Sequence, residues 1–393
     1  MNTAVESLKS RGAVYERLGV KPIINACGTW TTLGGSIMEP EVAQAIGEAS
    51  RVMVRLRDLN ERAGEMIAKY THAEAGLVTA GGHDAMMLQA AACITGKDPA
   101  KIKRLPDTEG MKNEIIISWN HNNYHEHAWR AAGAKMVWVG LSTSIRGWEG
   151  WEIEAAINEE TVALAFLATR WCPDSFESLD EMVQIAHHHG LPVIVDAAAM
   201  LPPVENLWKF IDHGADMVAF SGGKAIRAPQ SAGILCGRRD LIEAAALNHS
   251  PNDGVGRGSK VCREEIVGLM VALERYMQRD HAADQRRWYE QCDTIAAAIV
   301  EIQGVKAEVL QDDWTHPVPE LHIHFTSNWS GPSPDVIVDT MAKSDPSILI
   351  GGHRPGGGQL FVNPHGFMEG EAELVGERLH TAMKRNYKLN RGT

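Results

Sequence analysis

An aspartate and a lysine stand directly after two apolar segments of the sequence. Asp196 closes the run 193–195, and Lys224 ends a Ser-Gly-Gly-Lys turn that follows the apolar segment 216–220. A partly desolvated lysine has a lowered pKa and becomes a competent nucleophile towards an aldehyde. A buried carboxylate requires a partner, such as a helix cap, a cation or a protonated ring nitrogen. Taken singly, each residue is equally compatible with a structural ion pair.

A glycine-rich turn adds a possible anion site. Thr79-Ala-Gly81-Gly82 follows the short apolar run 76–79 and precedes a segment, 84–94, whose Ala, Met and Leu content predicts a helix. Glycines allow close approach of the backbone to an anion, and a helix N-terminus offers free N–H groups at the positive end of its dipole. The alternative is a tight turn without function.

Histidines are concentrated in the stretch Asn120-His-Asn-Asn-Tyr-His-Glu-His127. His121 and His125 are four residues apart and His127 is close by, which is compatible with zinc or iron. However, no HExxH or H-x-E…C-x-x-C pattern accompanies them, and we expect no metal site. A flat imidazole at position 121 that stacks on a cofactor ring, or acts as a general acid, fits the stretch better.

Alternating strands and helices must position these residues. Short apolar, β-branched runs predict strands, and amphipathic runs that end in glycine predict helices. The predicted strands are 76–79, 114–118, 135–139, 161–168, 192–196 and 216–220, and helices are expected over 41–70, 84–94, 129–134, 179–189 and 207–213. Such β-α-β repeats predict an α/β fold with a mostly parallel sheet covered on both faces.

The pattern changes near residue 262. One long amphipathic helical stretch is expected over 262–298, and short strands and a helix follow at 305–310, 321–325, 334–341 and 347–350. We therefore expect an N-terminal segment (1–20), a large cofactor-binding domain (21–265), and a linking helix with a small α+β C-terminal domain (266–393).

Composition excludes several classes of protein. The chain has 393 residues with 50 acidic and 38 basic side chains, a formal net charge of −12, which argues against nucleic acid as the main partner. We find neither a signal peptide nor an apolar run long enough to cross a bilayer. Six scattered cysteines without a CxxC pair indicate reduced thiols and a cytoplasmic location.

The glycine turn, Asp196 and Lys224 are stronger evidence for a cofactor site in combination than singly. Ligands of open α/β sheets bind at the carboxyl ends of the strands, where the glycine turn, Asp196 and Lys224 are all expected. Pyridoxal phosphate (PLP) requires such a set: a phosphate site, a lysine for the Schiff base and an acid for the pyridinium nitrogen.

The chain resembles fold-type I PLP enzymes of the selenocysteine synthase-like group, and in particular their D-glucosaminate-6-phosphate ammonia-lyase branch. The resemblance extends from about Leu18 to about Leu379. It is carried by the segments 18–29, 192–199 (PVIVDAAA), 214–226 (GADMVAFSGGKAI) and 229–238.

The resemblance implies a role for each matching residue. Lys224 would hold the cofactor and move the α-proton, Asp196 would pair with the ring nitrogen, and His121 would lie over the ring. The phosphate would be bound by Ser221 and by the backbone of Gly81, Gly82 and His83. Lys260 and Arg257 could reach a phosphate, also one across a subunit boundary. The expected substrate contacts are Arg354 for a carboxylate, together with Tyr124, Trp171 and Arg257. At least a homodimer is implied.

The reaction implied is an α,β-elimination. A small β-hydroxy amino acid or amino-sugar acid would lose its β-hydroxyl and yield a 2-oxo acid and ammonia. A racemase or epimerase is the alternative within enzymes, with Tyr124, His83 or Cys172 as a second acid. Selenium or sulfur transfer to an aminoacyl-tRNA is disfavoured by the net charge, and a catalytically silent cofactor-binding protein by the presence of Lys224. His83 and Asp84 depart from the small residues usual after the cradle glycine, and are expected to alter the cavity.

Overall fold

The computed structural model describes residues 2–141, 147–169, 174–312, 314, 316–352 and 358–384. The chain divides into two compact units, Ser36–Arg279 and Met1–Gly35 together with Asp280–Thr393. Among the described residues, no helix combines the length and the apolar character that crossing a bilayer requires.

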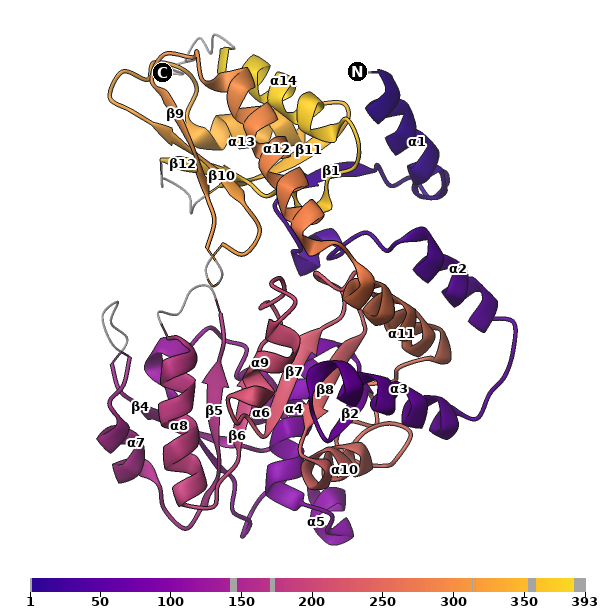
Figure 1. Ribbon diagram of the computed structural model, residues 1–393, viewed down its shortest axis with the longest axis vertical. Coiled ribbons are helices and arrows are strands. Elements are labelled where there is room, and N and C mark those ends of the chain that lie inside the picture. The colour runs from indigo at the N-terminus through magenta and orange to yellow at the C-terminus, as the bar shows by residue number, and fades with distance from the viewer. Residues whose placement is uncertain are drawn as a thin grey trace, which may run out of the picture. The chain divides into compact units, whose positions relative to one another are not determined.

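The larger unit, Ser36–Arg279, is built on a seven-stranded sheet (Figure 1). Its order is β2-β8-β7-β6-β5-β3-β4; the pairs from β7 to β4 are parallel, and β8 runs antiparallel to both of its neighbours. The strands are β2 (Ala75–Thr79), β3 (Glu114–Ser118), β4 (Lys135–Val139), β5 (Thr161–Leu167), β6 (Val193–Asp196), β7 (Met217–Ser221) and β8 (Gly233–Gly237). The predicted mostly parallel sheet is thus confirmed, with β8 as the strand that sequence patterning did not identify.

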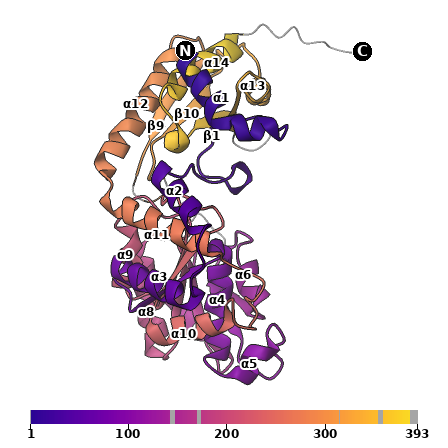
Figure 2. The ribbon, with the colours of Figure 1, turned by 90° about the vertical axis from the view of Figure 1, so that its right-hand side faces the viewer.

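Helices cover both faces of this sheet, as α/β folds require. The helices are α2 (Pro40–Ala49), α3 (Leu56–Thr71), α4 (Gly81–Thr95), α5 (Pro99–Arg104), α6 (His127–Ala131), α7 (Gly150–Ala156), α8 (Phe176–His188), α9 (Asn206–Asp212), α10 (Arg239–Asn248) and α11 (Arg263–Gln278). Helices α5, α6 and α10 pack around α4 on one face, and α3, α8 and α9 lie on the other (Figure 2). Helix α4 is buried nearly all round, which explains its apolar sequence.

The smaller unit has a five-stranded sheet of order β1-β11-β12-β10-β9. Its elements are α1 (Asn2–Arg17), β1 (Ile23–Ala26), α12 (His281–Ile299), β9 (Val305–Leu310), β10 (Glu320–Phe325), α13 (Pro334–Ala342), β11 (Ser347–Gly352), β12 (Gln359–Val362) and α14 (Glu371–Lys384). Strand β1 pairs in parallel with β11, so the N-terminal residues belong to this unit's sheet, whereas the sequence suggested that residues from 21 onward join the large domain. The remaining pairs of the sheet are antiparallel.

Two long predicted helices are each interrupted. The stretch 41–70 is split into α2 and α3, because Ser50 donates its hydroxyl back to the Gly47 carbonyl and Val52 and Val54 favour extended backbone. The stretch 262–298 is split where the Asp280 side chain accepts the Ala283 N–H and begins α12.

Gly64 lies inside α3 and determines how closely that helix packs against β2. A Cβ atom at Gly64 would lie 2.5 Å from the carbonyl oxygen of Gly76, and a Cβ at Gly76 would lie 2.3 Å from Ile67. The two glycines therefore allow α3 and β2 to approach closely.

We expect Gly64→Ala to lower the free energy of unfolding by about 1–3 kcal/mol, because the added methyl overpacks the α3–β2 contact. Gly47→Ala is the matched control: no atom lies within 4 Å of a Cβ there, and the substitution should be neutral or stabilising by up to about 1 kcal/mol. Urea unfolding followed by circular dichroism measures both. Equal stability of the two variants would contradict this account of the packing.

Candidate active site

The glycine turn after β2 begins helix α4. Gly81 has φ +81°, a conformation that L side chains rarely adopt, and a Cβ at Gly82 would lie 3.1 Å from the Ala198 Cβ and 3.9 Å from the Ser221 Cβ. The first turn of α4 therefore lies beside the residues that follow β6 and the end of β7. Its N–H groups have no carbonyl partner within the helix, so the turn is suited to an anion such as a phosphate group.

Asp84 caps this helix end. It is buried, and its Oδ2 accepts the Ala80 N–H at 2.9 Å and lies 3.5 Å from Nδ1 of buried His249. Burial raises the pKa of Asp84 and lowers the pKa of His249. His83, in contrast, is exposed. The sequence predicts that both residues alter the cavity. Asp84 instead stabilises the start of α4 by accepting the Ala80 N–H.

Asp196 ends β6 and is almost fully buried, with 3% of its surface exposed. Its Oδ1 accepts the Ala198 N–H at 2.9 Å. Burial raises the pKa of this carboxyl, whereas the Ala198 hydrogen bond and the nearby charges of Lys224, His125 and His83 oppose the rise. A buried carboxylate that draws on cationic neighbours is suited to pair with a protonated ring nitrogen.

The loop after β7 presents Lys224. Glycines are required before it, because a Cβ at Gly223 would lie 2.5 Å from the Gln230 Cα. Ser36 donates both its backbone N–H and its hydroxyl to the Gly223 carbonyl, each at 3.0 Å. Lys224 is partly buried; its desolvation lowers the pKa of the amine, and Asp196 partly offsets this. The lysine and the aspartate thus influence each other from the ends of the adjacent strands β6 and β7.

Gln89 is a site-supporting residue that the sequence analysis missed. Fully buried on α4, it donates its amide to the carbonyls of Val195 (3.0 Å) and Met217 (3.3 Å) and accepts the Trp129 indole N–H at 3.1 Å. It therefore binds α4 to β6 and β7, the strands that carry Asp196 and lead to Lys224. The sequence signal for this role is a single polar side chain, Gln89, within the apolar part of the predicted helix 84–94.

His121 is buried with both ring nitrogens engaged. Its Nδ1 accepts the Leu167 N–H at 3.3 Å, and its Nε2 lies 2.7 Å from Oδ2 of Asp174. Because Nδ1 accepts, the proton of the neutral ring lies on Nε2 and is donated to Asp174. Phe166 packs edge-on against the ring at 5.1 Å. This arrangement fixes the ring plane and favours stacking over the transfer of a proton to substrate.

Three of the other predicted site residues are exposed in the structure. Tyr124 is 77% exposed and has φ +68°. Nε of Arg257 lies 3.6 Å from Oδ1 of Asp253. Both Arg257 and Lys260 are exposed. Arg354, Trp171 and Cys172 lie outside the described residues, so their expected roles stay predictions.

The residues present fit PLP. A Cβ at Gly82 would fill the phosphate cradle, a partly buried lysine is available for the covalent link, and a buried carboxylate stands beside it. Together they comprise the phosphate site, the amine and the acid that this cofactor needs.

Comparisons with known proteins agree with the fit. Residues 103–260 match the family described as Aminotransferase class-V. The chain is 33% identical over 371 residues to D-glucosaminate-6-phosphate ammonia lyase of Salmonella typhimurium, covering 93% of this chain and 96% of the relative. A solved structure of D-glucosaminate-6-phosphate ammonia-lyase superposes with a TM-score of 0.81 at 32% identity, covering 94% of this chain and 98% of the other.

Relatives with other names match as well. The chain is 31% identical to 5'-C-glycyluridine monooxygenase-decarboxylase of a Streptomyces species, covering 93% of this chain and 90% of the relative. It is 30% identical to L-seryl-tRNA(Sec) selenium transferase of Solidesulfovibrio magneticus, covering 69% of this chain and 58% of the relative. With these similarities and the lysine–aspartate site, the chain belongs to the fold-type I PLP enzymes of the selenocysteine synthase-like group, in the family of D-glucosaminate-6-phosphate ammonia lyase.

Proposed function

We propose that this protein is a PLP-dependent lyase that removes the α-proton and the β-hydroxyl of a β-hydroxy amino acid or amino-sugar acid as water. Hydrolysis of the resulting enamine then takes up one water and releases ammonia and a 2-oxo acid. The observation that carries the proposal is the pair of desolvated groups, Lys224 and Asp196, beside the N-terminus of α4. The ammonia-lyase relative, covered over nearly its whole length, supports this substrate class.

The cofactor, when bound, supplies an electron sink for the charge left on the substrate α-carbon. The protein's own residues would divide the remaining tasks. Nζ of Lys224 removes the α-proton, because its lowered pKa leaves the amine unprotonated at a lower pH than that of an exposed lysine. The Asp196 carboxylate would hold a proton on the ring nitrogen. The α4 N-terminus and Ser221 would bind the phosphate.

His121 would position the cofactor ring. Its hydrogen bonds to Leu167 and Asp174 hold the imidazole in one plane against Phe166. The general acid that protonates the departing hydroxyl is then another group, and Tyr124, whose side chain is exposed, is a candidate. Arg354 is the expected ligand of the substrate carboxylate, and Trp171 is an expected substrate contact.

We further propose a cytoplasmic homodimer as the minimum assembly. Lys260 and Arg257 are exposed in the single chain, which supports a role towards a phosphate in a neighbouring subunit rather than in their own.

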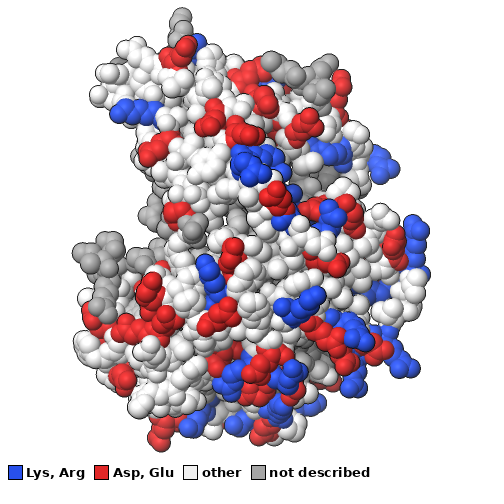
Figure 3. Space-filling model, in the orientation of Figure 1, with Lys and Arg blue, Asp and Glu red and all other residues white. Residues whose placement is uncertain are grey.

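Three other reactions can be compared with this elimination. The decarboxylase relative favours loss of the substrate carboxylate as the second candidate. Transfer to tRNA is disfavoured by the net charge of −12, and Figure 3 shows Lys and Arg side chains interspersed with Asp and Glu on the face in view rather than gathered into one basic surface. Racemisation would use the same lysine but release no ammonia.

The reaction is tested by incubating the protein, loaded with PLP, with a panel of D- and L-β-hydroxy amino acids and amino-sugar acids. We expect stoichiometric ammonia and 2-oxo acid from at least one compound, with α-deuterium exchange in D₂O. Lys224→Ala should lower turnover by at least about 10²–10⁴-fold, the usual contribution of a general base. Lys103→Ala, an exposed lysine on α5, is the control. Release of CO₂ or inverted amino acid without ammonia would reject the elimination.

The lowered pKa of Lys224 gives a pH prediction for the cofactor-free protein. Reductive methylation by formaldehyde requires the unprotonated amine, so its rate at Lys224 should reach a plateau at lower pH than the rate at exposed Lys103. Asp196→Asn removes the carboxylate that raises this pKa, so the profile should move to still lower pH. Peptide mass spectrometry gives both rates. A shift to higher pH in Asp196→Asn would contradict the assigned coupling.

A further inference from the structure

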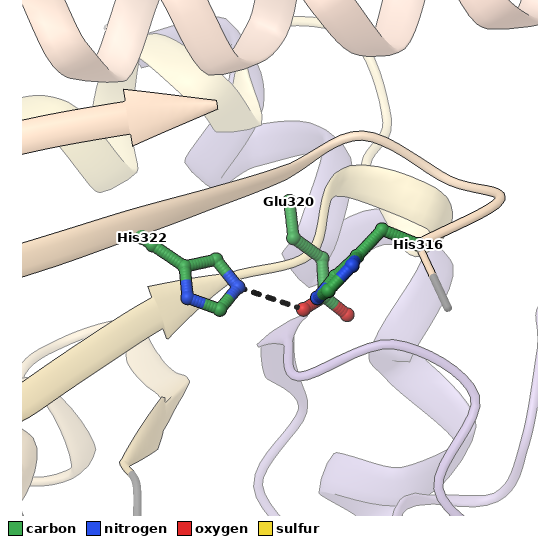
Figure 4. Close-up of side chains that lie close together, drawn as sticks. All are labelled: His316, Glu320 and His322. Carbon is green, nitrogen blue, oxygen red and sulfur yellow. Dashed lines mark hydrogen bonds and ion pairs between the residues drawn. The ribbon is translucent and has the colours of Figure 1, made fainter. Parts of the chain in front are cut away.

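A second cluster of ligand-type side chains lies in the smaller unit. His316, Glu320 and His322 each offer one ligand atom, and these atoms all lie within 4.8 Å of one another. His316 lies in the loop after β9, and the other two lie on β10. Figure 4 shows the three side chains directed towards one another.

The pleat of β10 explains why two of these residues share a face. Side chains at i and i+2 of a strand point to the same side, so Glu320 and His322 lie opposite Leu321 and Ile323. The side chains of Leu321 and Ile323 are both fully buried in the core of the smaller unit. Glu320 and His322 are nevertheless buried as well, with 2% and 7% of their surface exposed. A buried carboxylate requires compensation by hydrogen bonds, by a positive charge or by a metal ion.

The distances suit a metal ion. Nε2 of His322 lies 3.3 Å from Oε2 of Glu320. Two tetrahedral zinc ligands, each bound at 2.0–2.1 Å, lie about 3.4 Å apart. This pair is thus already at coordination spacing, and the ring centroid of His316 lies 5.4 Å from that of His322.

Outer hydrogen bonds complete the arrangement. Nδ1 of His316 pairs with Oδ2 of Asp312 at 3.2 Å. Oε1 of Glu320 accepts the Asn363 amide at 2.9 Å, which leaves Oε2 directed at His322. Metal-bound histidines usually donate their second nitrogen to a carboxylate, and ligating carboxylates are themselves hydrogen-bonded.

We propose that His316, Glu320 and His322 form a binding site for a divalent transition-metal ion, with Zn²⁺ the best fit. Two imidazoles select a transition metal over Mg²⁺ or Ca²⁺. Two histidines and one carboxylate leave the fourth tetrahedral position open for water or an oxygen ligand. The ion would tie the loop after β9 to β10 and neutralise the buried carboxylate. The proposal is independent of the PLP reaction.

This site differs from the one that the histidine-rich stretch suggested. Within the described part of the chain, His121 is committed to Asp174 and Leu167, and residues 121–127 do not bring three ligand atoms together. The sequence predicts no metal site, and the spacing His316-x₃-Glu320-x-His322 matches neither HExxH nor H-x-E…C-x-x-C.

The test is zinc binding to the intact protein after treatment with a chelator, by competition with a chromophoric zinc probe and by elemental analysis. We expect about one tightly held Zn²⁺ per chain with a Kd at or below about 1 μM. His316→Ala/His322→Ala should weaken binding at least about 100-fold, and Asp312→Asn, which removes only an outer hydrogen bond, about 10- to 100-fold. His316→Ala alone is a milder variant, because that side chain is partly exposed.

His189→Ala is the matched control. Its Nε2 pairs with Oε2 of Glu154 at 3.0 Å. Among the residues that the structure describes, this histidine–carboxylate contact belongs to no three-ligand cluster, so zinc binding should not change. Zinc should raise the melting temperature of the wild-type protein and not that of the double variant. Absence of micromolar zinc binding in the wild-type protein, or equal affinity in a folded double variant, would overturn the proposal. Either result would leave the ammonia assay unaffected.

Discussion

The mutual influence of Lys224 and Asp196 is the constraint on which the rest of the larger unit depends. Two ionisable groups are withdrawn from water at neighbouring strand ends, where burial lowers the pKa of the amine and raises the pKa of the carboxyl. Each group moderates the other's shift. Removing one partner of such a buried pair leaves an uncompensated group, which costs far more than the pair contributes to stability. The pair is therefore better explained by chemistry at the site than by folding.

The surrounding structure holds this pair in place through backbone contacts. Gln89 joins α4 to β6 and β7, Asp84 caps the start of α4, and Ser36 holds the Gly223 carbonyl next to the lysine. None of these side chains needs to touch a substrate. They fix where the strand ends and the anion-binding turn lie relative to each other, and catalytic geometry tolerates errors of only a fraction of an ångström.

The sequence predicted the parts of this site that follow from local pattern. Asp196 and Lys224 close apolar runs, and parallel strands bring their carboxyl ends to one edge, so their proximity could be inferred without coordinates. The role of Asp84 could not, because a carboxylate two residues after a cradle glycine can equally face the cavity or cap the helix. The pairing of β1 with β11 joins segments more than 300 residues apart, and strand patterning carries no information about such partners.

The cluster of His316, Glu320 and His322 shows a further limit of sequence patterning. Alternation along 320–325 predicts a strand whose apolar face, Leu321 and Ile323, is buried and whose polar face meets solvent. Burial of Glu320 and His322 on that second face arises from chain that packs over it, including Asn363, which hydrogen-bonds to Glu320. The polar face of this strand can be recognised as a possible metal site only when the segments that pack over it are known. The histidines that stood out by density along the chain, 121 to 127, were therefore a weaker guide to metal binding than a pair separated by six residues and brought together by a loop.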